Sequence, residues 1–351
     1  MKIAILGGGA QGRVIAADLA ASLPDARVVV ADLVRPGLPP RHNLKWIELD
    51  LSSRDAIARL LAGHDLGVCA LPSRYGFAAL EAAIEAKRNM VDVSFAAEDP
   101  LALDDRARAA GVTLVPDAGL APGISNLVIG HAVATRGTPR ELMIYVGGVS
   151  QDPSAPFGYV VTWSVDDLLE EYVRPARIMR DGKVVTVPVF SGMETLDLPE
   201  VGTMEAFYSD GLRSLLYTLP GVRDMGEKTL RWPGHAEAVQ PLVATGAFVH
   251  TLREVCTATP ARDLVALRVR LTFASGSQTW DMTDRYDEAT DRTAMSRTTA
   301  LTTSVVTQLA AAGGAGAPGV RPLEKVGADE KAFRFVRDGL AQRGVRLRVD
   351  G

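Results

Sequence analysis

The sequence predicts an α/β protein, in which a Rossmann-type parallel-sheet domain is joined to a second α+β domain built on a largely antiparallel sheet. In residues 1–125, short apolar strand patterns alternate with helical patterns, which is typical of right-handed βαβ units on a parallel sheet. From Glu141 onward, strand patterns are instead separated by short turns, which favour antiparallel pairing.

The first domain begins with Lys2–Leu6, an apolar run that stops at glycines, and continues into Arg13–Ala21, which has the apolar spacing of a helix. Further strands and helices are expected in alternation along this domain. The strands are Ala26–Ala31, Leu44–Leu49, Asp65–Leu71, Asn89–Val93 and Val112–Val115, and the helices are Ser53–Ala62, Gly76–Ala86 and Pro100–Ala110.

The second domain is expected to span residues 126–297, with C-terminal helices of about 298–351 packing back onto the first domain. Asp181-Gly182 and Ala274–Ser277 predict two hairpin turns. The other expected elements are a strand at Glu141–Val149, a helix at Ser164–Val173 with Ser164 as N-cap, helices at Thr298–Ala312 and Asp329–Arg343, and a strand at Val345–Val349.

Composition excludes several classes of protein. A net charge of −4 over 351 residues argues against general affinity for nucleic acid or anionic membranes. No apolar stretch is long enough for a transmembrane helix, and the N-terminus does not read as a signal peptide. The two cysteines, Cys69 and Cys256, form no metal-binding pattern, so we expect no metal site and a reducing, cytoplasmic location.

The segment Gly7–Gly12 predicts dinucleotide binding. It matches GxGxxG directly after a strand and at the start of a helix, and Asp32 stands twenty residues beyond Gly12 at the end of the next strand. Gly7 allows the tight turn, Gly9 the approach of the pyrophosphate, and Gly12 close packing of helix on strand. Because Asp32 would accept hydrogen bonds from ribose hydroxyls and repel a 2′-phosphate, NAD is favoured, although Arg35 leaves NADP open.

Other cofactor contacts are expected where strands and loops end at the same edge of the sheet. Asp50 ends the third strand, where it either meets the adenine edge or is a neighbour of the next helix's N-cap. Ser94 follows the fifth strand. The full expected cofactor set is Gly7, Gly9, Ala10, Gln11, Gly12, Asp32, Leu33, Asp50, Leu71, Pro72, Ser94, Gly119 and Leu120.

Several segments resemble the saccharopine dehydrogenase superfamily. They are Val91–Ser94, Asp117–Asn126, Glu205–Arg213, Lys228–His235 and the tail around Leu323–Phe333. Together they are most similar to the lysine 6-dehydrogenase branch. Ala121 favours that branch, because saccharopine reductases carry an aspartate there; the alternative is that Ala121 starts a helix before Pro122.

The resemblance implies NAD-dependent oxidation of the ε-amino carbon of L-lysine, with the second domain forming the substrate pocket and a homodimer or higher homo-oligomer. The product would be 2-aminoadipate 6-semialdehyde, which cyclises to piperideine-6-carboxylate. An amine loses hydride only in its neutral form, and a lysine ammonium has a pKa near 10.4. The enzyme must therefore bind the neutral amine, remove a proton or operate at alkaline pH.

The resemblance also indicates substrate-binding residues. Arg213 would bind the α-carboxylate, or else is a solvated helix arginine. Thr229 and Arg231 share a face if their segment is a strand, and their alternative is a salt-bridged sheet surface. The remaining candidates for contact with the substrate are Ser94, Tyr208 and Asp210.

His235, Asp92 and Lys228 are the candidate catalytic residues. His235 is expected to titrate near neutrality, against the alternative of a structural histidine bonded to the backbone. Asp92 is a buried carboxylate near the cofactor, and Lys228, with Glu205 and Asp210, is an alternative proton acceptor. Two other functions stay open: a saccharopine- or carboxynorspermidine-type reductase that forms a secondary amine from an imine, and a non-catalytic NAD-sensing protein.

Overall fold

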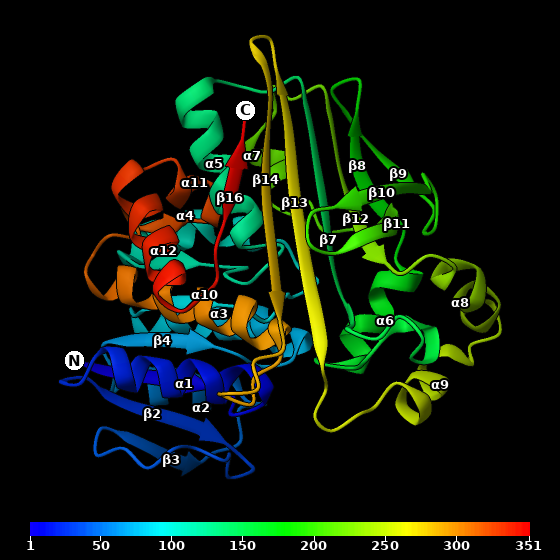
Figure 1. Cartoon of the computed structure of the whole chain (residues 1–351). Helices are drawn as coiled ribbons and strands as arrows, with labels where there is room; N and C mark the ends of the chain where they lie inside the picture. Colours follow the sequence, from blue (N-terminus) through cyan, green and yellow to red (C-terminus); the bar gives the residue numbers. More distant parts are fainter. The chain divides into compact units, whose positions relative to one another are not determined.

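The computed structural model describes all 351 residues, which form two compact units. Unit 1 contains residues 1–131 and 299–343, and unit 2 contains residues 132–298 and 344–351 (Figure 1). The last eight residues differ from the expectation that the whole tail packs on the first domain. Their strand β16 (Arg348–Asp350) pairs antiparallel with β14 (Gly276–Arg285) of unit 2, so they belong to that unit.

Unit 1 is built on a seven-stranded parallel sheet with the order β15-β6-β5-β4-β1-β2-β3. Apart from β15, the six strands have the order of a Rossmann fold. The strand order reverses between β1 and β4, which is the point where ligands bind in this fold. The strands are β1 (Lys2–Leu6), β2 (Arg27–Asp32), β3 (Leu44–Glu48), β4 (Leu66–Cys69), β5 (Asn89–Asp92), β6 (Thr113–Val115) and β15 (Gly319–Val320). The parallel sheet expected from the sequence is confirmed.

The helices of unit 1 bury apolar faces against this sheet. Leu61 and Leu80 pack into one core with Leu6 and Met90 of β1 and β5, and all four are fully buried. The helices are α1 (Ala10–Ser22), α2 (Arg54–Ala62), α3 (Ser73–Ala86), α4 (Asp104–Ala110), α11 (Leu323–Gly327) and α12 (Glu330–Gln342), with a 3-10 turn, η1, at Pro100–Leu103. Helices α5 (Ile124–Arg136) and α10 (Ala294–Ala311) each contain a unit boundary.

Unit 2 is built on a nine-stranded, largely antiparallel sheet, as the sequence predicts. Its one parallel pair joins β12 (Asp224–Arg231) to β7 (Glu141–Ser150). The other strands are β8 (Ala176–Arg180), β9 (Lys183–Val187), β10 (Glu194–Leu198), β11 (Gly202–Tyr208) and β13 (Asp263–Phe273), with β14 and β16. Both expected hairpins are present, and the second has a two-residue turn because Phe273 already pairs with Gly276.

The two faces of the unit 2 sheet carry separate apolar clusters. One cluster joins Phe207 of β11 to Tyr172 and Phe248 of the helices. The other joins Tyr145, Ala206 and Leu230. The helices are α6 (Val165–Val173), α7 (Leu215–Thr218), α8 (His235–Ala244) and α9 (Phe248–Val255), with a 3-10 turn, η2, at Pro156–Gly158. Ser164 caps α6 as predicted, since its hydroxyl accepts a hydrogen bond from the Asp167 amide.

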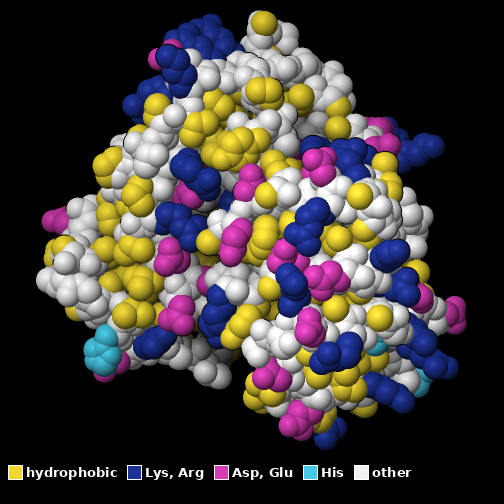
Figure 2. Space-filling model, turned by 180° about the vertical axis from the view of Figure 1, so that it is seen from behind, with side chains coloured by type: hydrophobic (Ala, Val, Ile, Leu, Met, Phe, Trp, Pro, Cys, Tyr) yellow, Lys and Arg dark blue, Asp and Glu magenta, His cyan; other side chains and the backbone are white.

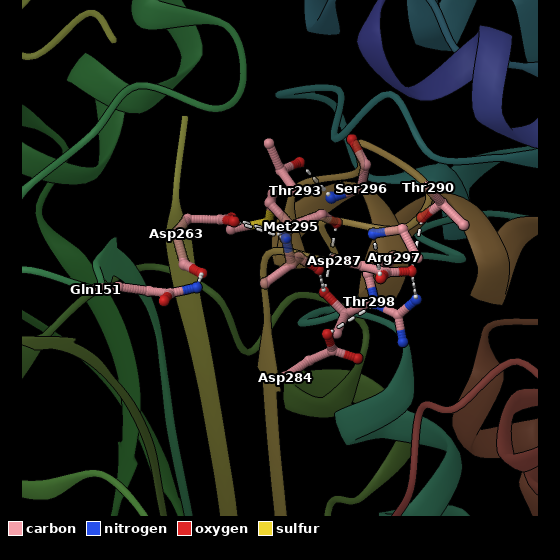
Figure 3. Close-up of polar contacts among 12 residues, drawn as sticks. Gln151, Asp263, Asp284, Asp287, Thr290, Thr293, Met295, Ser296, Arg297 and Thr298 are labelled. Atoms are coloured by element: carbon pink, nitrogen blue, oxygen red, sulfur yellow. Dashed lines mark hydrogen bonds and ion pairs between the residues drawn. The ribbon is translucent and has the colours of Figure 1, made fainter. Parts of the chain in front are cut away.

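Helix α10 begins four residues earlier than the sequence predicts, because a distant carboxylate caps it. Figure 3 shows Asp263 of β13 facing the start of the helix, and its two oxygens accept hydrogen bonds from the amides of Ala294 (2.6 Å) and Met295 (2.9 Å). Arg297, one turn further along, is held by Asp284 at 2.8 Å. Sequence spacing alone does not show a cap that lies 31 residues before the helix.

The surface carries charges of both signs. Figure 2 shows basic and acidic side chains interspersed across the middle of the face that it draws. Many of these charges form exposed ion pairs such as Arg348–Glu200 at 2.7 Å, and each such pair contributes little to stability. No helix combines the length and the apolar character needed to cross a membrane.

Candidate functional site

The glycine turn between β1 and α1 has the geometry that a pyrophosphate requires. Gly7 has φ +94°, which favours glycine, and its amide donates to the Ala31 carbonyl. A Cβ on Gly12 would lie 1.9 Å from the Gly7 carbonyl oxygen, so only glycine permits this packing of helix on strand. A Cβ on Gly9 would meet nothing within 4 Å. The N-terminus of α1, including Ala10 and Gln11, therefore offers open amide donors to an anion.

Asp32 ends β2 beside this turn, as predicted. Its carboxylate accepts hydrogen bonds from the amides of Gly8 (2.6 Å) and Val34 (3.0 Å), which fix its orientation. A carboxylate has about four acceptor positions, so two amides leave capacity for ribose hydroxyls. The guanidinium of Arg35 lies 5.9 Å from the ring centroid of Trp46, in the segment that follows Asp32.

The other expected cofactor residues of unit 1 follow strand ends, with one shift. Asp50 lies two residues beyond β3 rather than at its end, and its carboxylate accepts from the Ser52 amide at 2.8 Å, which lowers its pKa. Leu71 and Pro72 lie between β4 and α3, and Leu33 is exposed after β2. Gly119 and Leu120 lie in the turn before α5, since their carbonyls accept from Ile124 and Ser125. Helix α5 begins at Ile124, so the alternative of a helix start at Ala121 is wrong.

Asp92 and Ser94 lie at the carboxyl end of β5. Asp92 is only 1% exposed, and its carboxylate accepts from the Ser94 amide at 3.0 Å. Burial, followed by the negative charge of Asp117, raises the pKa of Asp92 to about 6. The Ser94 hydroxyl is buried without a hydrogen-bond partner, as is the side-chain oxygen of Gln11. The Gln11 side-chain oxygen is therefore available to a ligand, whereas the Ser94 side chain also interacts with Asp92.

In unit 2, the register of the sheet divides the predicted substrate residues between two faces. On β11 and β12, Tyr208 pairs with Lys228 and Phe207 with Thr229. Because side chains alternate along a strand, Thr229 and Arg231 share one face, as predicted, and Tyr208 and Lys228 lie on the other. The predicted site residues therefore do not all converge, and two of the candidates are separated from Arg231 by the sheet itself.

Lys228 and Tyr208 interact with each other on that second face. The Lys228 ammonium donates to the Gly192 carbonyl (2.6 Å) and to Glu194 (2.5 Å), and it lies 4.7 Å from the centroid of the Tyr208 ring. Lys228 is thus buried in an ion pair. This arrangement favours a structural role over proton transfer.

Arg231 anchors helix α6 to the sheet through a buried polar network. Its guanidinium donates to the Tyr172 hydroxyl (2.7 Å), to Glu171 (3.1 Å) and to the Leu230 carbonyl (2.9 Å). The side chain of Arg231 is 3% exposed and that of Glu171 is 29% exposed. The salt bridge of the alternative is therefore present, but Arg231 itself is buried beneath α6 and does not lie on an exposed sheet surface. Thr229, two residues earlier, is also buried.

His235 completes this network, and the expectation that it titrates near neutrality is wrong. Its Nδ1 lies 2.8 Å from the Phe157 carbonyl and must donate to it, while its Nε2 accepts from the Tyr172 hydroxyl at 2.9 Å. Burial and the positive charge of Arg231 lower its pKa to about 3. A buried neutral imidazole with both nitrogens bonded fits the structural alternative.

Asp210 and Arg213 lie in the turn between β11 and α7. Asp210 forms a bidentate ion pair with Arg177, with distances of 2.9 Å from Nε and from Nη2. Arg213 is 5% exposed and has φ +50°, a conformation that costs an L-residue about 1–2 kcal/mol. The alternative of a solvated helix arginine is therefore wrong. Glu205, a further candidate base, accepts from the amides of Gly234 and Ala236 and caps α8.

Sequence reasoning missed the buried carboxylate of Glu227 on β12. Glu227 is 5% exposed and lies on the face of Thr229 and Arg231, two residues before Thr229. Its Oε2 has no hydrogen-bond partner. Burial, together with the charges of Glu171 and Asp210, raises its pKa to about 8. The alternation Glu227, Thr229, Arg231 was the signal that could have identified it.

The strand order of unit 1, the glycine turn and Asp32 together define a dinucleotide-binding protein of the Rossmann class. The chain belongs to the saccharopine dehydrogenase family. The family's NADP binding domain matches residues 3–115, and its saccharopine dehydrogenase C-terminal domain matches residues 119–345.

Curated relatives agree with this family, and one solved structure has the same fold. Saccharopine dehydrogenase [NADP(+), L-glutamate-forming] of Pyricularia oryzae is 28% identical over 57% of this chain and 47% of its own length. The enzyme of that name from Saccharomyces cerevisiae is 27% identical over 72% of this chain and 60% of its own length. This chain thus spans about half to three fifths of these relatives. The apo saccharopine dehydrogenase (L-Glu forming) structure from Saccharomyces cerevisiae superposes with a TM-score of 0.76, at 19% identity, over 99% of both chains.

Proposed function

We propose that this protein is an NAD-dependent dehydrogenase that oxidises the ε-amino carbon of L-lysine. The observation that carries the proposal is Asp32, whose carboxylate is oriented by two backbone amides where ribose hydroxyls bind in this fold. A negative charge at that position disfavours the 2′-phosphate of NADP. Ala121, where saccharopine reductases carry an aspartate, supports a substrate smaller than saccharopine.

In the proposed reaction, the bound dinucleotide supplies the hydride acceptor. The lysine ammonium first loses a proton. The neutral amine then loses hydride to give an iminium ion and NADH, and water hydrolyses the iminium ion to the aldehyde and ammonium. Of the candidate proton acceptors, Asp92 has a pKa raised to about 6 and lies in unit 1, where the dinucleotide would bind. His235, with its pKa near 3 and both nitrogens bonded, is a poor acceptor.

The competing proposal is an NADP-dependent reductase of the saccharopine type. It is favoured by the NADP(+) in the names of the two curated relatives and by Arg35, which follows Asp32 closely enough to meet a 2′-phosphate. The two proposals differ in cofactor and in direction, so one set of assays distinguishes them.

The test follows NADH absorbance at 340 nm after purified protein is mixed with NAD and L-lysine between neutral and alkaline pH. NADP, ornithine and saccharopine are assayed in parallel. NADH formation that requires lysine and rises with pH supports the proposal. Turnover of saccharopine with NADP, and none of lysine, would replace it with the reductase. NAD binding without turnover of any amine would favour the sensing protein.

A further inference from the structure

Glu227 has no paired cation, unlike the two acidic side chains that act on it electrostatically. The two acidic groups that act on it electrostatically are Glu171 of α6 and Asp210 of the β11–α7 turn. Glu171 is paired with Arg231 at 3.1 Å, and Asp210 with Arg177 at 2.9 Å. These two ion pairs are neutral overall, so the cluster as a whole lacks one positive charge when Glu227 is ionised.

Two further buried polar atoms lack partners, one opposite Glu227 and one in the turn that follows β11. Ser209 continues β11 opposite Glu227, since its amide donates to the Glu227 carbonyl at 3.1 Å, and the register places both side chains on the same face. The Ser209 hydroxyl is buried and unpartnered, and the Ser214 hydroxyl a few residues further along the same turn is too. Buried polar groups are almost always hydrogen-bonded in native proteins, so these three atoms are available to bond a ligand.

The space for the carboxylate is provided by a glycine. A Cβ on Gly211 would lie 1.5 Å from Glu227 Oε1, so any larger residue would displace the carboxylate. Gly211 thus lets the backbone of the turn pack directly on the carboxylate. The geometry holds Glu227 in place without neutralising it.

We propose that Glu227, with the hydroxyls of Ser209 and Ser214, forms the receptor for a primary ammonium group of the substrate. An ammonium group supplies one positive charge and three donors, which matches one carboxylate and two hydroxyl acceptors. A divalent cation fits less well, because the neighbouring carboxylates are already bonded to arginines. The inference rests on the proposed function, which identifies the amine as L-lysine. It places the receptor for an ammonium group of that substrate in unit 2.

If an ammonium group binds to Glu227, the Glu227 carboxyl group should release its proton. With a pKa of about 8, Glu227 holds a proton at pH 7 in the free protein, and it must release the proton to bind a cation. The two charged groups that act on Glu227 are Glu171 and Asp210, and they are paired with Arg231 and Arg177.

The test is isothermal titration of the full chain with L-lysine, 1,5-diaminopentane and the neutral isostere 1,5-pentanediol, at pH 7, in buffers that differ in ionisation enthalpy. The wild type should bind both amines and release about one proton for each ligand molecule that binds. Glu227→Gln should bind them at least tenfold more weakly and release none, since it loses a charge-assisted hydrogen bond. Gly211→Ala should weaken amine binding in the same way, because it displaces the carboxylate. The exposed Glu200→Gln serves as the matched control and should behave like the wild type.

Amine binding by Glu227→Gln within twofold of the wild type would overturn the inference, as would a wild type that binds neither amine. A wild type that binds amines through Glu227 but forms no NADH from lysine would support the receptor and refute the proposed function. NAD affinity, measured in the same variants, should be unchanged, because Glu227 and Gly211 lie in unit 2 and the glycine turn lies in unit 1.

Discussion

Replacement of Glu227 by glutamine should stabilise the ligand-free protein at neutral pH. The pKa of Glu227 rises from 4.5 to about 8 on folding, chiefly because the side chain is buried. A raised pKa means that the folded state binds this proton more tightly than the unfolded state. The stability from this group is therefore fully present below pH 4.5 and is lost as the pH rises toward 8.

The size of the effect follows from these two values. Each pH unit between them costs about 1.4 kcal/mol of unfolding free energy, so the loss at pH 7 is roughly 3 kcal/mol. For a unit of this size, a change of 1 kcal/mol shifts the melting temperature by about 2–4 °C, so roughly 6–12 °C is expected. The amide of glutamine needs partners of its own, and an unsatisfied donor costs about 1–3 kcal/mol. The pH slope is therefore more informative than the stability at one pH.

The assay is thermal and urea unfolding of wild type and Glu227→Gln between pH 5 and 8, without ligand. The difference in unfolding free energy should grow with pH in favour of the variant. Asp92 and Asp263, whose pKa values are both raised to about 6, contribute equally to both proteins and cancel in the difference. Unfolding curves that stay parallel from pH 5 to 8 would refute the argument that Glu227 is buried without a counter-charge. Glu200→Gln provides the exposed Glu-to-Gln control.

Three further predictions concern other residues. Asp32→Ala should weaken NAD binding by about 10- to 100-fold while changing NADP binding much less, because a charge-assisted hydrogen bond contributes about 1.5–3 kcal/mol; equal losses for both cofactors in fluorescence titrations would contradict this. Asp263→Ala should lower stability by about 1–2 kcal/mol through loss of the α10 cap, whereas the exposed Asp152→Ala should change stability much less when both are unfolded in urea. His235 should show no change in its ring NMR shifts between pH 5 and 8, because it stays neutral; a midpoint within that range would show that its network is open to solvent.

The parts of the fold that local patterns determine were predictable from the sequence. Strand–helix alternation predicted the parallel sheet, and the turn residues Asp181-Gly182 predicted a hairpin that the structure confirms. The start of α10 was not predictable, since its cap comes from Asp263 on another strand. The placement of the last strand was also missed, because pairing of β16 with β14 depends on residues far apart in the chain.

The candidate site divides in the same way. The glycine turn and Asp32 form a local motif whose spacing encodes its geometry, so their positions could be anticipated. In the second unit, by contrast, residue type did not reveal the role. His235 looked like a proton carrier and is a buried neutral group, and Lys228 looked like a base and is an ion-paired cation on the other face of the sheet. Burial and register, which no short motif records, decide both cases.

The role proposed for Glu227 explains why a buried carboxylate without a counter-charge would be useful in spite of its cost to the fold. Nearby carboxylates are neutralised by arginines, and a third arginine beside Glu227 would stabilise the ligand-free protein and occupy the position proposed for the substrate amine. An unpaired carboxylate instead lowers the stability of the ligand-free protein, and the binding of a cation restores part of that stability. If the proposal is right, L-lysine should raise the melting temperature of the wild type more at pH 8 than at pH 5. Glu227→Gln should lose that pH dependence while keeping its own higher melting temperature. A ligand-induced shift of equal size in both proteins would mean that the amine binds elsewhere.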